Sequence, residues 1–273
     1  MKRLHMLKSA TDTIINSFIY EEDDHLLVID GGFESEAPTL LSYLQSLGGR
    51  VDGWFLTHAH PDHYGALCAI LRDAPRAISI HRVYLNFPSL SDLARISGEE
   101  EKRTNDRLIP ELLSLLQDSG IEQIAPRVGD TYIFGSAALR VMREHDSTVF
   151  TSINDTSMVY RLDTGADRVM FLGDLTEEGG RQLLSLHAPE ELRSDYCQMA
   201  HHGQDGVGRE VYEVIRPTVC LWPTPSWVWD NLGPNGYDSG SLKTVIVRGW
   251  MSELGIRRHY IDRDAPHVID FEK

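Results

Sequence analysis

The stretch Thr57-His58-Ala59-His60-Pro61-Asp62-His63 places three imidazoles and one carboxylate within seven residues. Imidazole nitrogens and carboxylate oxygens are ligands that zinc and related ions accept in proteins. Residues 51–57 read as a short buried strand and residues 64–71 as the first turns of a helix. Because a strand-to-helix corner holds its side chains on a rigid frame, the stretch predicts a metal site facing a cleft.

The spacing inside this cluster indicates two pairs of ligands. In an extended or turning segment, His58 and His60 point the same way. Asp62 and His63 follow the bend and reach a second point a few ångströms away. We therefore expect one ion on His58 and His60 and another on Asp62 and His63, the arrangement that supports two-metal hydrolysis.

The composition bounds the class of protein. The chain has 273 residues and a net charge of −15, which argues against a broad nucleic-acid-binding surface. Nucleic acid is not excluded, because bound divalent ions reverse the local sign of charge. The three cysteines are too scattered for a disulfide framework, and neither a signal peptide nor a membrane span is evident. We expect a cytoplasmic protein without a membrane partner; its oligomeric state is not specified.

The hydrophobic pattern alternates between strands and helices. The first half predicts a hairpin over 11–30 with its turn at 21–24, a helix over 38–48 and a strand over 76–85. Residues 89–125 differ in character and predict helices, forming an insert in a single domain that spans 1–273. The charge run over 99–103 is interpreted as a solvated helix face, although such an insert could also cover the cleft. The second half predicts strands over 131–134, 138–142, 157–162, 168–172 and 196–200, and a helix over 176–186 capped by Thr176. Strands that occur in pairs favour mixed sheets over a parallel sheet.

Two further sites repeat the logic of the first cluster. Asp174 follows Gly173 at the end of an apolar strand, where a carboxylate can project into the cleft and bridge both ions. His201-His202-Gly203 ends another strand. One of these two histidines should point into the cleft; we expect His202 to be the ligand and His201 to lie beside the site or act in catalysis.

These motifs, in this order, resemble the metallo-β-lactamase superfamily, and Asp30-Gly31-Gly32 resembles its first motif. The resemblance spans about residues 11 to 270. It implies a four-layer αββα sandwich, an α/β (α+β) fold of two mixed sheets flanked by helices. It also implies a hydrolase with two divalent ions, zinc by expectation and manganese or iron as alternatives. In that family the aspartate matching Asp30 supports the site without binding metal.

One departure from the family pattern concerns a histidine about twenty residues before Asp174. Asn154 and Asp155 occupy the corresponding stretch, and His145 lies further upstream. Asn154 or His145 is therefore a tentative ligand of the ion on His58 and His60. The Asn-Asp-x-Ser pattern resembles a subgroup that includes nuclease-like domains of DNA-uptake proteins and phosphorylcholine esterases, and it disfavours a true β-lactamase.

The sequence thus predicts a hydrolase that uses a metal-bound hydroxide on a phosphodiester or related ester. Its partner would be a small-molecule or ester substrate. Asp62 or His201 would move protons. Thioester or amide hydrolysis and a non-hydrolytic metalloprotein, either redox or binding scaffold, are the alternatives. The tryptophans of segment 222–229 could form an aromatic wall for the substrate or pack as core, and the sequence favours neither.

Overall fold

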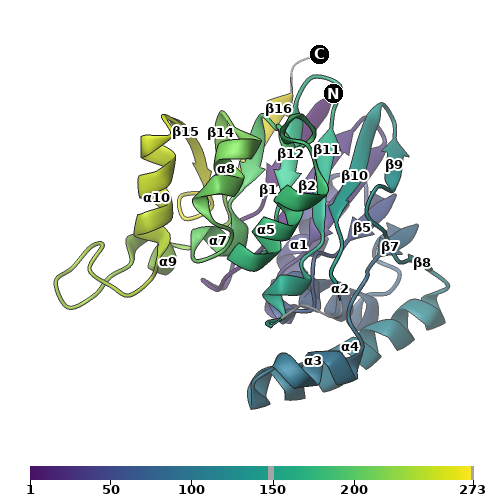
Figure 1. Cartoon of the computed structure of the whole chain (residues 1–273). Helices are drawn as coiled ribbons and strands as arrows, with labels where there is room; N and C mark the ends of the chain where they lie inside the picture. The colour runs from purple at the N-terminus through teal and green to yellow at the C-terminus, as the bar shows by residue number, and fades with distance from the viewer. Residues whose placement is uncertain (147–150, 272–273) are drawn as a thin grey trace.

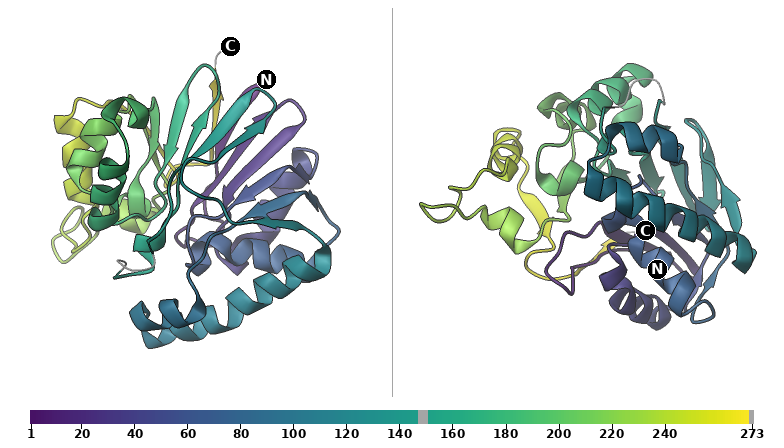
Figure 2. Two further views of the ribbon diagram at one scale, coloured as in Figure 1. Left: turned by 45° about the vertical axis from the view of Figure 1, so that its right-hand side comes forward. Right: turned by 90° about the horizontal axis from the view of Figure 1, so that it is seen from below.

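The structure is a computed structural model that describes residues 1–146 and 151–271. Within these residues two large sheets pack face to face (Figures 1 and 2). The first sheet runs in the order β16 (His267–Phe271), β1 (Lys2–Met6), β2 (Ser17–Glu22), β3 (His25–Asp30), β5 (Gly53–Phe55), β7 (Arg82–Tyr84) and β8 (Glu122–Ile124). The second runs β15 (Arg258–Ile261), β14 (Val219–Trp222), β13 (Tyr196–Gln198), β12 (Arg168–Phe171), β11 (Val159–Asp163), β10 (Ala137–Arg143) and β9 (Thr131–Phe134).

Both sheets are mixed, with one antiparallel half and one parallel half. In the first sheet β16, β1, β2 and β3 pair antiparallel, and β3, β5, β7 and β8 pair parallel. In the second sheet the antiparallel half contains β9 to β12, and the parallel half contains β12 to β15. This confirms the predicted mixed sheets.

Helices cover the outer face of each sheet, which confirms the αββα sandwich (Figure 2). Those following the first-sheet strands are α1 (Ala37–Ser46), α2 (Pro61–Asp73), α3 (Leu90–Ile96) and α4 (Glu99–Ser119). Those following the second-sheet strands are α5 (Glu177–Leu186), α6 (Pro189–Leu192), α7 (Ala200–Gly203), α8 (Arg209–Ile215), α9 (Ser226–Asp230) and α10 (Thr244–Glu253). Among the described residues, no helix has both the length and the apolar character needed to cross a membrane.

The alternation of side chains along each strand builds the layers. Phe18 and Tyr20 of β2 pack in the core between the sheets, whereas Ile19 faces the core under the helices. On β12, Phe171 lies between the sheets and Met170 lies under the second set of helices. A strand that is covered on both faces must be apolar on both sides. Strands such as β2 and β12 therefore appear in the sequence as continuous apolar runs.

Several boundaries differ from the sequence prediction. The strand expected over 51–57 is divided at Asp52, and residues 122–124 of the expected helical insert form the strand β8 rather than a helix. The hairpin turn is Asp23–Asp24 alone, because Glu22 continues β2 and pairs with His25. The single strand expected over 76–85 is divided: β6 (Ser79–Ile80) pairs with β4 (Arg50–Val51) in a small separate sheet, and β7 joins the first sheet. Hydrophobicity alone does not reveal such a change of partner.

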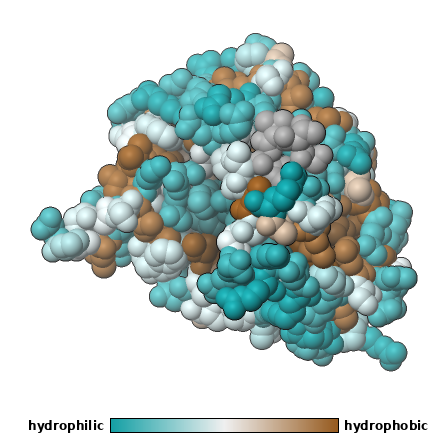
Figure 3. Space-filling view, turned by 60° about the horizontal axis from the view of Figure 1, so that its bottom comes forward, coloured by the Kyte–Doolittle hydropathy of each residue, from teal (hydrophilic) through white to brown (hydrophobic). Residues whose placement is uncertain are grey.

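The α3–α4 segment (residues 90–119) follows β7 and lies at one end of the sandwich (Figure 1). Helix α4 packs against α2 through Leu108 and Leu112, and the Tyr64 hydroxyl donates to Asn105 Oδ1 at 3.1 Å. Figure 3 views the molecule with this end turned forward, and hydrophilic side chains cover much of that face.

Candidate metal centre

The candidate ligands come from the ends of strands in both sheets. His58 and His60 lie between β5 and α2, and Asp62 and His63 lie in the first turn of α2. Pro61 is the first residue of that helix, where the lack of an N–H costs nothing and φ already suits the helix. Asp174 follows β12, and His202 lies in α7 directly after β13. The strand ends of the two sheets therefore meet at one edge of the sandwich.

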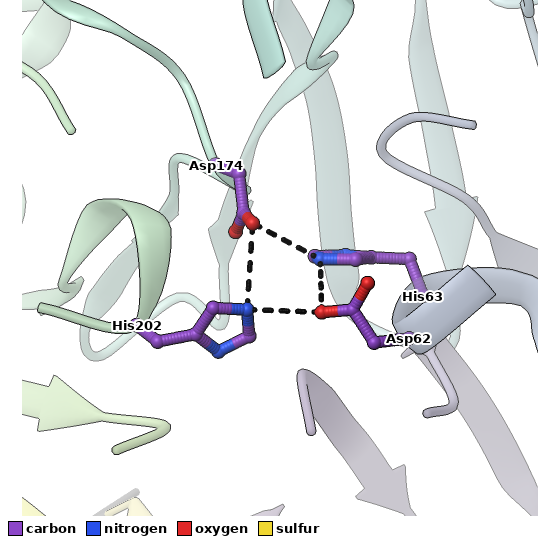
Figure 4. Close-up of side chains that lie close together, drawn as sticks. All are labelled: Asp62, His63, Asp174 and His202. Carbon is purple, nitrogen blue, oxygen red and sulfur yellow. Dashed lines mark hydrogen bonds and ion pairs between the residues drawn. The ribbon is translucent and has the colours of Figure 1, made fainter. Parts of the chain in front are cut away.

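Four side chains converge in the first group of ligand atoms: Asp62, His63, Asp174 and His202 (Figure 4). His202 Nε2 lies 3.2 Å from Asp62 Oδ2 and 3.4 Å from Asp174 Oδ2. His63 Nε2 lies 3.5 Å and 3.4 Å from the same two oxygens. One atom from each residue thus faces a common point, as a four-coordinate ion requires.

A second group shares Asp174 with the first. It consists of His58, His60 and Asp174, whose ligand atoms lie within 4.8 Å of one another. His58 Nε2 lies 2.9 Å from His60 Nδ1 and 3.9 Å from Asp174 Oδ2. The structure therefore brings together all six residues that the sequence proposes as principal ligands, with Asp174 in the position of a bridge.

Hydrogen bonds on the far side of the rings fix the protonation of His58 and His63. Thr57 Oγ1 donates to Asp30 Oδ2 at 2.8 Å, so it can only accept from His58 Nδ1 at 3.1 Å. His63 Nδ1 donates to Asp30 Oδ2 at 2.7 Å. Both rings therefore carry their far-side proton on Nδ1 and direct Nε2 into the site. Outer partners of this kind orient metal-binding histidines.

The other two rings are held in the same manner. His202 Nδ1 lies 3.0 Å from the carbonyl oxygen of Pro223, which can only accept. His60 Nε2 lies 2.7 Å from Glu101 Oε1, so its Nδ1 is the nitrogen that faces His58. All four imidazoles thus have an acceptor on the outside and present the opposite nitrogen to the centre.

The electrostatics of the centre favour a cation. Burial lowers the pKa of His202, but Asp174 and Asp62 outweigh it and raise that pKa to about 10. Burial also opposes the charged form of His63, yet Asp174, Asp30 and Asp62 raise its pKa well above the ordinary value. Burial, with the neighbouring His63 and His60, holds the pKa of His58 well below its ordinary value. The carboxylates therefore stabilise positive charge at the centre. A proton on the histidines can carry that charge, and so can a divalent cation that replaces the proton.

Two buried atoms in the centre make no hydrogen bond with any of the described residues, and their chemistry tests whether this site fits a metal ion. They are His63 Nε2 and Asp174 Oδ1. A buried polar atom without a partner costs free energy. Both atoms belong to groups that bind metal, and a mixed set of nitrogen and oxygen donors fits zinc, manganese or iron. The donor set therefore fits divalent cations.

The backbone that delivers His202 adopts a conformation that few residues accept. His201, His202 and Gly203 have φ of 51°, 55° and 74°, all in the left-handed region. A Cβ on Gly203 would lie 2.5 Å from Trp222 Cε3, so only glycine fits here. Non-glycine residues in this region are strained and concentrate at functional sites.

The remaining predicted residues separate into two groups. His201 is 27% exposed at its side chain, and its Nε2 lies 3.4 Å from Asn154 Nδ2 at the margin of the centre. Asp30 lies directly behind His63. His145 instead lines a separate cavity with Arg127, Arg143 and Gln182, and the groups of potential metal ligands among the described residues do not include it. The structure thus places His145, the tentative ligand of the ion on His58 and His60, just after β10 and against this other cavity.

Sequence reasoning missed three contributors. Thr57 lies directly before the histidine cluster, but the sequence pattern indicates no role for its hydroxyl. The carbonyl of Pro223 has no sequence signal, because any residue supplies that group. The charge pattern over 99–103 indicates a solvated helix face for Glu101, whereas the packing of α4 on α2 brings its side chain to His60.

The tryptophans of segment 222–229 do not form one surface. Trp222 is fully buried, its ring contacts Trp229 edge to face at 5.2 Å, and its Nε1 donates to His259 Nδ1 at 3.0 Å. Trp227, in α9, is 45% exposed. Trp222 therefore belongs to the core, and Trp227 is the exposed tryptophan of this segment.

The fold and this site define a class of metal-binding sandwich proteins. The family model of the metallo-beta-lactamase superfamily matches residues 10–200, and the chain belongs to that superfamily. The superfamily consists mostly of metal-dependent hydrolases, and its fold binds divalent metal ions. ComE operon protein 3 of Bacillus subtilis (strain 168) is 21% identical over 185 residues, which are 67% of this chain. The match covers 21% of that protein, so the chain spans about a fifth of this relative's length.

Solved structures with the same fold cover nearly all of the chain. The metallo-beta-lactamase fold protein YhfI from Bacillus subtilis has a TM-score of 0.59 and 12% identity, over 99% of this chain and 100% of that one. CmlA, a diiron beta-hydroxylase from Streptomyces venezuelae, has a TM-score of 0.58 and 13% identity, over 98% and 54%. Igni18, a metallo hydrolase from Ignicoccus hospitalis, has a TM-score of 0.53 and 13% identity, over the full length of both chains.

Proposed function

We propose that this protein is a dinuclear metal-dependent hydrolase that cleaves a phosphodiester or a related ester. The observation that supports this is the pair of ligand groups that share Asp174. A carboxylate between two cation sites can hold the ions close enough to act on one bond.

Each ion would have its own set of residues. Asp62, His63 and His202 would hold one ion, His58 and His60 the other, and Asp174 both. Divalent ions in such a site activate a water molecule and polarise the oxygen of the scissile bond. The protein contributes a preset geometry, since the outer hydrogen bonds already direct the four ring nitrogens inward.

Asp62 and His201 are the residues that we propose for proton transfer. Asp62 belongs to the ligand group and is 14% exposed at its side chain, so water reaches it. His201 is more exposed and lies close enough to His58 to lower that residue's pKa. Its position at the margin suits proton transfer to a leaving group, whereas His202 is buried among the ligands.

The proposed bond type follows from charge. The chain carries a net charge of −15, so an anionic ester needs local cations to approach it. Two divalent ions supply that charge at one point, and paired ions are common in enzymes that hydrolyse phosphate esters. Because CmlA is a diiron protein with this fold, iron is measured beside zinc and manganese.

The test combines metal analysis with a substrate panel. Purified protein is analysed for zinc, manganese and iron, and then assayed with bis-p-nitrophenyl phosphate, p-nitrophenyl phosphate, a thioester and a chromogenic β-lactam. Asp174→Asn should lose metal and activity together, whereas Asp118→Asn, an equal change of charge on the exposed end of α4, should retain both. Two ions with preferential diester cleavage support the proposal. Full metal content without hydrolysis of any substrate, or unchanged activity in Asp174→Asn, contradicts it.

A further inference from the structure

Helix α4 makes a direct contact with the candidate centre through Glu101. Its Oε1 lies 2.7 Å from His60 Nε2, and the two residues are 41 positions apart in the chain. The other carboxylate oxygen, Oε2, accepts from the backbone N–H of Gly98 at 3.2 Å, at the start of α4. One carboxylate therefore caps the helix and holds the histidine at the same time.

The chemistry of this contact determines which nitrogen of His60 carries a proton. An ionised carboxylate only accepts hydrogen bonds, so His60 Nε2 must donate to Glu101. The bare nitrogen is then Nδ1, which lies 2.9 Å from His58 Nε2. His58 Nε2 is also bare, because His58 Nδ1 donates to Thr57. The two unprotonated nitrogens thus face each other, as two ligands of one cation do.

The turns of α4 that follow Glu101 are held by buried contacts, so the helix presents Glu101 to His60 from a fixed position. Asn105 and Leu108, in the following turns, are buried, and Asn105 accepts from Tyr64 of α2. Arg107 pairs with Glu34 at 2.9 Å on the same side of the molecule. The Glu101 side chain is 37% exposed and that of His60 only 17%.

We propose that Glu101 is a positioning residue that holds His60 with Nδ1 toward the metal and thereby couples α4 to the ion on His58 and His60. This inference rests on the proposed metal centre for its effect on affinity, but the orientation of His60 can be tested without metal. Its consequence is reciprocal: binding of that ion should further stabilise the first turn of α4, and a change in that turn should weaken binding of the ion. The α3–α4 segment would then regulate one half of the centre.

The experiment measures the protonation of His60 and the affinity for metal separately. In full-length protein labelled with ¹⁵N, the ring nitrogens of His60 are assigned by comparison with His60→Gln, and their shifts report which nitrogen is protonated. Stepwise zinc titration with a competing chelator then gives the affinity of each ion. The variants are Glu101→Ala, Glu101→Gln and, as a matched control, Glu100→Ala, which removes the same side chain from an exposed position in the same turn.

In wild-type protein and Glu100→Ala, we expect His60 to be protonated at Nε2. Glu101→Ala should lose that preference, and one of the two ions should bind about 10- to 100-fold more weakly. Glu101→Gln retains an acceptor oxygen and should recover most of both properties. If Glu101→Ala keeps the wild-type ring shifts, or if it affects zinc no more than Glu100→Ala does, the proposal is wrong. If wild-type protein binds no ion, the proposed function fails, and the ring shifts alone decide whether Glu101 positions His60.

Discussion

Replacing Asp30 with Asn should disrupt the centre although Asp30 is not one of the proposed ligands. Its carboxylate is fully buried and accepts four hydrogen bonds. The Thr57 N–H donates to Oδ1 at 2.8 Å; at Oδ2, Asn16 Nδ2 donates at 2.7 Å, Thr57 Oγ1 at 2.8 Å and His63 Nδ1 at 2.7 Å. Asn has the same shape and tolerates the left-handed φ of 55° at this position, so the change removes the charge and replaces one acceptor oxygen with an NH₂ donor.

The size of the effect follows from these four bonds. An Asn oxygen can satisfy one side of the group, but its NH₂ then faces at least one donor, and a buried donor without a partner costs roughly 1–3 kcal/mol. The bonds that remain lose the contribution of the negative charge, which makes such bonds about twice as strong as neutral ones. We expect the free energy of unfolding to fall by about 3–5 kcal/mol in total. The ion on His63 should bind about 10- to 100-fold more weakly, because the ring loses its orienting partner.

Urea denaturation and zinc titration measure the two effects, and Asp24→Asn in the exposed hairpin turn is the matched control. If Asp30→Asn changes the free energy of unfolding by less than about 1 kcal/mol and leaves both zinc affinities unchanged, the assignment of Asp30 as the support of His63 and Thr57 is refuted. Loss of stability with unchanged zinc affinity would limit its role to the fold.

Three further changes test other parts of the structure. Burial raises the pKa of Asp262 to about 7. The unfolded chain releases this proton near about pH 4, whereas the folded protein keeps it until about pH 7. The free energy of unfolding should therefore fall as the pH rises from about 4 to 7. Asp262→Asn should remove this decline and raise the free energy of unfolding at pH 8 by about 2–4 kcal/mol, measured by urea denaturation at pH 5 and 8; equal pH dependence in both proteins would contradict it. Thr176→Ala removes the oxygen that accepts from Gly179 N–H at 3.3 Å at the start of α5 and also contacts Asp155. It should cost about 1–2 kcal/mol in the same assay, and Thr176→Ser should restore most of that loss. Gly203→Ala forces a methyl group against Trp222 and should lower the melting temperature and the zinc content together, so a variant with both values at wild-type level would show that the His202 loop is not constrained as described.

Much of this centre could be predicted from the sequence because its ligands are dense and lie at strand ends. His58, His60, Asp62 and His63 follow one apolar strand, and Asp174 follows another. Apolar runs locate strands, and a polar residue directly after such a run projects at the edge of the sheet. Local sequence therefore carries the information for these positions.

The contacts that orient the rings could not be predicted in this way. Glu101 reaches His60 only because α4 packs on α2, and an acidic run on a helix has the same pattern whether it meets solvent or a histidine. The carbonyl of Pro223 acts through the backbone, which carries no residue-specific signal. Similarly, β1 and β16 pair at the edge of the first sheet from opposite ends of the chain, and no local pattern indicates that pairing.

The convergence of strand ends from both sheets has a consequence for how the protein comes apart. Asp62 belongs to the first half of the chain and His202 to the second, 140 positions later, yet they lie side by side. Ions held by both would be coordinate cross-links between the two sheets. The sheets could not separate until those bonds broke, so the lifetime of the loaded protein at high temperature would follow the rate of metal release rather than the equilibrium free energy.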